Sequence, residues 1–117
     1  MNHLNSTLIE GVIREDAVFY KGVDNKEQCA FGIASTRCYQ EGNDLRKQVC
    51  NFSVRFNAPH LVEAARKYAK KGRGIRAVGR LESISPGDTW IEAEHVEYRS
   101  EYVKKAGRRN DSTNKEI

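Results

Sequence analysis

The chain has 117 residues, of which 31% are charged and 38% hydrophobic, and its formal net charge is +4. This length suits one domain with a short extension, and no apolar run approaches the ~20 residues of a membrane-spanning helix. The first residues have neither the basic region nor the apolar core of a secretory signal. We therefore expect a cytoplasmic protein without a membrane partner.

The beginning of the chain has the composition of a β-strand. Residues 7–14 are rich in β-formers and contain Gly11, which indicates a bend or a close backbone approach. Residues 17–20 are expected to continue this strand after a kink at Glu15 and Asp16.

Two further strands are predicted before a helical pattern begins at Pro59. Residues 28–36 alternate large side chains with small ones, and the small face marks a place where another group must approach the backbone closely. A turn signal at residues 41–44 lies within an expected polar loop, and residues 49–56 form the next strand.

A helical period begins at Pro59, a residue that suits the first helical turn. Its apolar face, expected to be buried, consists of Leu61, Ala65, Tyr68 and Ala69. Lys70 and Lys71 suit the negative C-terminal end of a helix, and Gly72 suits a left-handed stop.

The last strands form a short hairpin. Residues 75–84 turn through residues 85–88 into a strand over residues 89–96. Five strands with one helix between the third and the fourth predict an all-β fold, a five-stranded Greek-key barrel of the oligonucleotide-binding (OB) type, over residues 1–102. Residues 103–117 are basic and lack apolar periodicity, so we expect a disordered tail.

No set of residues predicts an enzyme or a metal site. The cysteines form an odd number without a metal-binding spacing, and no nucleophile with a base or phosphate-cradling loop is present. The three cysteines, expected to be free thiols, are Cys29, Cys38 and Cys50. We therefore expect neither a metal nor another cofactor.

The charge is distributed unevenly. Residues 99–117 supply +3 of the net +4, because they hold six cations and three acids. Between Glu63 and Glu82 there are seven cations and no acid, whereas residues 88–101 are acidic. A basic and an acidic face on one small barrel favour a directed anionic partner.

Several stretches together resemble the bacterial single-stranded DNA-binding protein family, over about residues 4–98. They are residues 5–11 (NSTLIEG), 34–36 (AST), 61–72 (LVEAARKYAKKG) and 78–81 (VGRL). The Tyr-x-Lys-Lys-Gly helix exit and the following Gly-x-Leu strand are the most specific elements. The resemblance implies a homotetramer of OB domains that coats single strands in replication, recombination and repair.

The resemblance also implies positions for base stacking and phosphate contact. Phe52 matches an aromatic position in the strand before the helix, Tyr39 matches one in the loop between the second and third strands, and Lys71 matches a basic residue at the helix exit. The chain departs from the family in a shorter hairpin at residues 83–88. It also has a basic ending in place of the acidic tip that recruits other enzymes, which puts that recruitment in question.

Aromatic rings and cations are the two groups that hold a single strand, by stacking on bases and by pairing with phosphates. The candidate stacking residues are Phe52, Tyr39, Trp90 and Phe56. Core packing is an open alternative for Phe52 and Phe56, whereas Trp90 alternates with glutamates on a polar face. The candidate phosphate contacts are Arg37, Arg46, Lys47, Arg55, Lys71, Arg73, Arg76 and Arg80. For these cations, a solvated surface is the alternative.

Two other functions fit the same fold. One is a dimeric, primosome-type accessory protein, which the mass in solution would distinguish from a tetramer. The other is an RNA-binding barrel, which a comparison of RNA and DNA binding would identify. The leading hypothesis is a single-stranded DNA-binding protein without sequence specificity, associated with the nucleoid.

Overall fold

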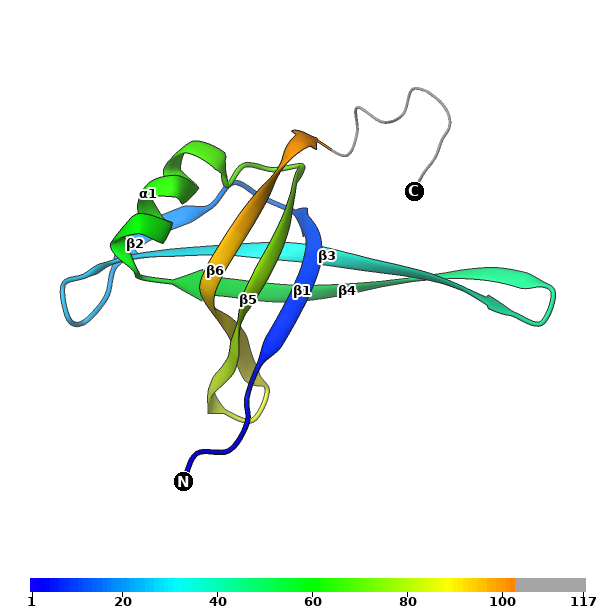
Figure 1. Cartoon of the computed structure of the whole chain (residues 1–117), viewed down its shortest axis with the longest axis horizontal. Coiled ribbons are helices and arrows are strands. Elements are labelled where there is room, and N and C mark those ends of the chain that lie inside the picture. Colours follow the sequence, from blue (N-terminus) through cyan, green and yellow to red (C-terminus); the bar gives the residue numbers. More distant parts are fainter. Residues whose placement is uncertain (103–117) are drawn as a thin grey trace.

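A computed structural model describes residues 1–102, which form six strands and one helix (Figure 1). The elements are β1 (Thr7–Ile13), β2 (Val18–Lys21), β3 (Glu27–Glu41), β4 (Asp44–Phe56), α1 (Pro59–Tyr68), β5 (Arg73–Ser85) and β6 (Asp88–Tyr102). The predicted tail, residues 103–117, lies outside the described residues. Within them, no helix is long and apolar enough to cross a membrane.

The strands form one sheet that closes on itself. Its order is β1-β5-β6-β4-β3-β2, and β1 pairs additionally with β3 at Val12 and Ile13. Because β2 then continues along β3, β1 and β2 act as one strand broken by a kink, as predicted. Counted in this way, the barrel has five strands with α1 between the third and the fourth, which confirms the predicted OB fold.

The predicted close approach at Gly11 is also confirmed. A Cβ atom at this position would lie 2.7 Å from the carbonyl oxygen of Ala34, so only glycine lets β1 reach β3. Gly79 is tighter still, because its Cβ would lie 2.0 Å from the carbonyl oxygen of Glu92 on β6. Gly11 thus permits the β1–β3 contact that closes the barrel, and Gly79 permits the close approach of β5 and β6 at a register shift between Val78 and Gly79.

The core fills the barrel and extends under α1. Its large, fully buried side chains are Phe56, Ile13, Ile33, Ile75, Ile91, Val54 and Cys29. Phe56 is only 1% exposed and packs edge-on against Phe31, with ring centroids 5.9 Å apart. This burial corrects the prediction of Phe56 as a base-stacking residue, because its ring is enclosed by the core.

Helix α1 begins as predicted, with Pro59 in its first turn, but it ends earlier than predicted. Tyr68 is its last residue, and Gly72, with φ of +91°, lies in the following turn. The expected burial of Tyr68 is wrong, since 38% of this residue is exposed. It lies in the last helical turn, where the ring packs on Tyr98 and not among the core side chains.

The most extended part of the molecule is a two-stranded ribbon. Strands β3 and β4 pair without interruption from Cys29 and Phe56 to Glu41 and Asp44, and their outer halves project from the barrel (Figure 1). We call residues 36–49 the arm. The predicted turn is confirmed, with Gly42 at φ of +63°, but the expected polar loop around it is wrong. A continuous ladder of backbone hydrogen bonds holds these polar residues as strands.

Candidate nucleic-acid interface

The alternation of the β3–β4 ribbon sorts the predicted residues onto two faces. One face continues the core side of the barrel outward and carries Phe52, Arg37, Tyr39 and Arg46. The opposite face carries Arg55 on the barrel and Lys47 on the arm. On the ribbon, the candidate aromatic rings therefore lie on the first face, whereas candidate cations lie on both faces.

Phe52 lies where the core side of β4 leaves the barrel. It is 38% exposed, although its cross-strand neighbour Ile33 is fully buried. Two residues further into the barrel, Val54 on the same face is also fully buried. The ring of Phe52 is therefore partly supported by the core and partly open to a ligand.

Tyr39 lies further out on the same face and is 37% exposed. The guanidinium carbon of Arg37 is 4.5 Å from the centre of the Tyr39 ring, and Nη2 of Arg37 donates a hydrogen bond to Gln48. The Arg37 side chain is thus fixed beside an exposed ring. Arg46, opposite Tyr39, instead pairs with Glu41 and Asp44 at 3.3 and 3.6 Å, so carboxylates near the arm tip already balance its charge.

The other face of the ribbon contains a cation that the sequence analysis missed. The small side chains of β3 leave space above Gly32, where a Cβ would lie 2.8 Å from Nη2 of Arg14. Arg14 also donates its backbone N–H to the carbonyl of Gly32 at 3.0 Å. The alternation of small residues predicted a close approach there, but no sequence signal identified Arg14 as the group that approaches.

Trp90 lies beside this face and contacts two polar side chains. The guanidinium carbon of Arg55 is 4.3 Å from its ring centre, and its indole N–H donates to Oε1 of Glu92 at 2.9 Å. The parallel pairing of β4 with β6 brings Arg55 opposite Glu92. The ring is therefore held in one orientation, with Arg55 over it.

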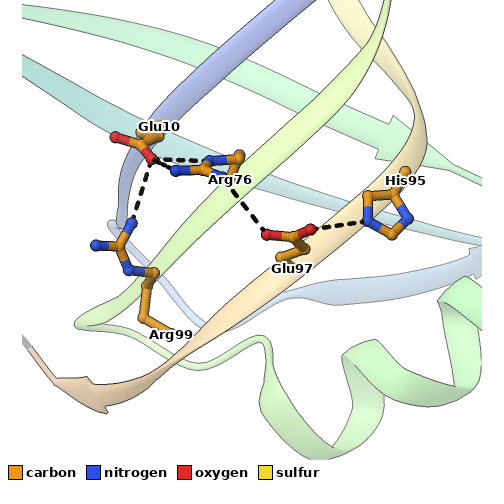
Figure 2. A network of polar contacts seen from close by, with 5 residues as sticks. All are labelled: Glu10, Arg76, His95, Glu97 and Arg99. Atoms are coloured by element: carbon orange, nitrogen blue, oxygen red, sulfur yellow. Dashed lines mark hydrogen bonds and ion pairs between the residues drawn. The ribbon is translucent and has the colours of Figure 1, made fainter.

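A different charge pattern covers the outer face of β1, β5 and β6 (Figure 2). Arg76 donates from Nε and Nη2 to Oε2 of Glu10 at 2.8 and 2.6 Å, and it lies 3.8 Å from Glu97. Arg99 also donates to Glu10, at 3.2 Å, and His95 lies 3.2 Å from Glu97. Hydrogen bonding from Arg76 and its positive charge lower the pKa of the Glu10 carboxyl. We call the outer face of β1, β5 and β6 that carries these residues and Arg80 the paired face.

Arg80 lies on the same outer side of β5 as Arg76 and is also satisfied. It donates to Glu82 and to Glu94, each at 2.6 Å, and the hydrogen bond to Glu82 raises the pKa of the guanidinium. The predicted phosphate contacts Arg76 and Arg80 thus already have carboxylate partners. By contrast, none of Arg14, Arg37, Lys47 and Arg55 forms an ion pair with a carboxylate of the described residues.

The remaining predicted contacts, Lys71 and Arg73, lie elsewhere, at the connection between α1 and β5. The backbone N–H of Lys71 donates to Oδ1 of Asp16 at 2.8 Å, and Nε of Arg73 donates to the carbonyl of Arg99 at 2.5 Å. The structure therefore divides the predicted phosphate contacts among the ribbon, the paired face and the helix exit.

The thiols differ in accessibility. Cys29 is fully buried, and burial raises its pKa to about 12, whereas Cys38 is exposed on the arm. A thiol with such a pKa stays protonated and unreactive at neutral pH. No group of three or more potential metal ligands occurs among the described residues.

Comparison with solved structures shows the fold. No protein-family model matches the sequence, and no curated protein matches it. The structure is similar to a Plasmodium falciparum SSB in complex with ssDNA, with a TM-score of 0.70, 16% identity, and coverage of 84% of this chain and 95% of that one. It is also similar to a small single-stranded DNA-binding protein from Streptomyces coelicolor, with a TM-score of 0.67, 20% identity, and coverage of 86% and 97%. The chain therefore has the fold of these proteins, along nearly their whole length.

Proposed function

We propose that the protein binds single-stranded DNA without sequence specificity, along the β3–β4 ribbon. The observation that carries this proposal is that cations without a carboxylate partner among the described residues lie against aromatic rings on and beside that ribbon. Arg37 flanks Tyr39, and Arg55 covers Trp90. The fold is shared with a protein whose structure holds single-stranded DNA, which supports the same class of ligand.

The two kinds of group act on different parts of the strand. Stacking of a base on an aromatic ring contributes ~1–3 kcal/mol and accepts any base, because every base has a π-face. Each phosphate neutralised by a cation adds a term that weakens with salt, by about 0.7 in log affinity per unit of log salt concentration for single strands. Because the ribbon has candidate groups on both faces, a strand could wrap around the arm.

Binding of this kind protects a strand without chemical change. A protein that binds only the unpaired form shifts the equilibrium away from hairpins and duplex. We therefore infer a non-enzymatic coating role in replication, recombination and repair, at the nucleoid in the cytoplasm. The family resemblance favours a homotetramer, and a dimeric mass in solution would favour the accessory, primosome-type role instead.

A fluorescence titration tests the proposal, because Trp90 is the only tryptophan. Unlabelled oligothymidine is added at low and at high salt, with duplex DNA and an RNA homopolymer of equal length as controls. We expect tight binding of the single DNA strand, weak binding of the duplex, and affinity that falls with salt. A failure to bind at low salt would reject strand coating, and a preference for RNA would support the RNA-binding alternative.

A further inference from the structure

The helix exit presents a second accessible ring outside the ribbon. Tyr68 is 38% exposed, the same fraction as Phe52, although the helical period predicted a buried residue. Its ring packs on Tyr98 with centroids 5.5 Å apart, at an interplanar angle of 37°. Tyr98 in turn packs against the core. The core therefore fixes Tyr68 in place through Tyr98, while part of its surface remains open.

Cations surround this ring. Nζ of Lys67 lies 5.7 Å from the ring centre of Tyr68, and the guanidinium carbon of Arg73 lies 5.3 Å from it. Lys70 and Lys71 follow Tyr68 after Ala69 and are exposed. Among the described residues, Lys67, Lys70 and Lys71 form no ion pair with a carboxylate. This is the same combination of unpaired cations and accessible ring that marks the ribbon.

The surface beside Tyr68 is an open hollow along α1, so a flat group can reach the ring. The hollow is lined by His60, Glu63, Ala64, Arg66, Lys67 and Tyr68. Arg66 forms an ion pair with Glu27, which leaves Lys67 as the cation nearest to the ring on this side. A rigid tyrosine binds a planar group with little loss of conformational entropy.

We propose that Tyr68, Lys67 and Lys70 form a second contact for single-stranded DNA, which binds nucleotides beyond those held by the β3–β4 ribbon. The ring stacks on a base, and the lysines neutralise the adjoining phosphates. This inference rests on the proposed function and extends it, because it predicts that the length of strand bound depends on the helix exit. A tyrosine that only shields Tyr98 from water would have no such effect.

The test compares oligothymidines of two lengths by fluorescence anisotropy. The short one has about 8 nucleotides, within the range that a single OB fold covers, and the other is several times longer. Tyr68→Leu is matched with Tyr20→Leu, which changes a tyrosine of similar exposure (41%) on β2. The double variant K67Q/K70Q is matched with K21Q/K26Q, which removes the same charge near the β2–β3 loop. Tyr68→Phe keeps the ring.

We expect Tyr68→Leu to bind the long strand about tenfold more weakly and the short strand as wild type does. Tyr68→Phe should restore long-strand affinity, and K67Q/K70Q should lower its salt slope by about 1.4. The control variants should match wild type, and thermal unfolding checks that each variant is folded. Equal loss on both lengths, or no loss on either, would overturn the inference. Absence of binding by the wild type would instead reject the proposed function itself.

Discussion

The β3–β4 ribbon and the paired face differ in how their positive charges are balanced. On the paired face, Arg76 contacts a carboxylate of β1, and Arg80 contacts carboxylates of β5 and β6. On the ribbon, Arg55 and Arg37 lie over aromatic rings and have no carboxylate partner among the described residues. A phosphate that approached the paired face would have to displace a carboxylate, whereas one that approaches Arg55 or Arg37 would not.

This difference shows that a count of cations along the chain is a poor guide to an anion-binding surface. Between Glu63 and Glu82 the sequence has seven cations and no acid. Folding brings Glu10 from β1 and Glu94 from β6 against two of these cations, Arg76 and Arg80. The linear excess of charge on β5 is thereby cancelled in three dimensions.

The largest expected effect is on the free energy of unfolding, and it should differ between two aromatic residues of β4. Phe56→Ala removes a core ring and should lower the free energy of unfolding by about 3–5 kcal/mol. Phe52→Ala, on the same face of β4 but 38% exposed, should cost clearly less stability. Urea unfolding of both variants provides the measurement. Equal losses would mean that Phe52 is a core residue and not a base contact.

Replacement of the ribbon aromatics should weaken binding more than it weakens folding. For Phe52→Ala and for Tyr39→Ala we expect a loss of ~1–3 kcal/mol in affinity for oligothymidine, because each removes one stacking surface. Val18→Ala, an exposed apolar residue on β2, serves as control. If only the Trp90→Ala variant loses affinity, the strand uses the Arg55 face of the ribbon and not the Tyr39 face.

Salt dependence should distinguish the ribbon cations from the paired ones. Arg55→Gln should lower the slope of log affinity against log salt by about 0.7, since one phosphate contact is lost. Arg80→Gln should leave the slope unchanged, because its guanidinium is already bonded to Glu82 and Glu94. The reverse pattern in titrations at several salt concentrations would place the strand on the paired face.

The smallest effect concerns the pH dependence of stability. The pKa of Glu10 is lowered in the folded protein, chiefly by its hydrogen bonds with Arg76. The contribution of ionised Glu10 to the stability of the fold is therefore present above pH 4.5, the ordinary pKa of this carboxyl. It is lost as the pH falls through the lowered pKa. Glu10→Gln should slightly reduce the loss of stability at acid pH. It should leave the pH dependence of stability near neutral pH unchanged. An unchanged acid limb, measured by thermal unfolding, would contradict this assignment.

The sequence predicted the fold well because the fold depends on local signals. Pro59 marked the start of the helix, and residues 41–44 marked the turn at Gly42. Each of these signals acts within a few residues. The arm was missed because its residues are polar, and a ladder of backbone hydrogen bonds leaves little trace in side-chain hydrophobicity.

The candidate interface was predicted less well because it depends on pairs that are distant in sequence. The alternation of β4 places Phe52 and Phe56 on the same face. Phe56 lies inside the barrel and is buried, whereas Phe52 lies at the edge of the barrel and is exposed. Likewise, Arg14 reaches Gly32 only because β1 crosses β3. Tyr68 follows the helical period, but its ring packs on Tyr98 and is 38% exposed.

Photo-crosslinking tests the location of the strand most directly. A short oligothymidine of about 8 nucleotides, matched to one OB fold, is irradiated with the protein, and the modified peptides are identified by mass spectrometry. We predict crosslinks in the peptides of β3 and β4, at Tyr39 or Phe52, and at Trp90. Crosslinks confined to the outer face of β1, β5 and β6, around Leu8, Val78 and His95, would contradict the account.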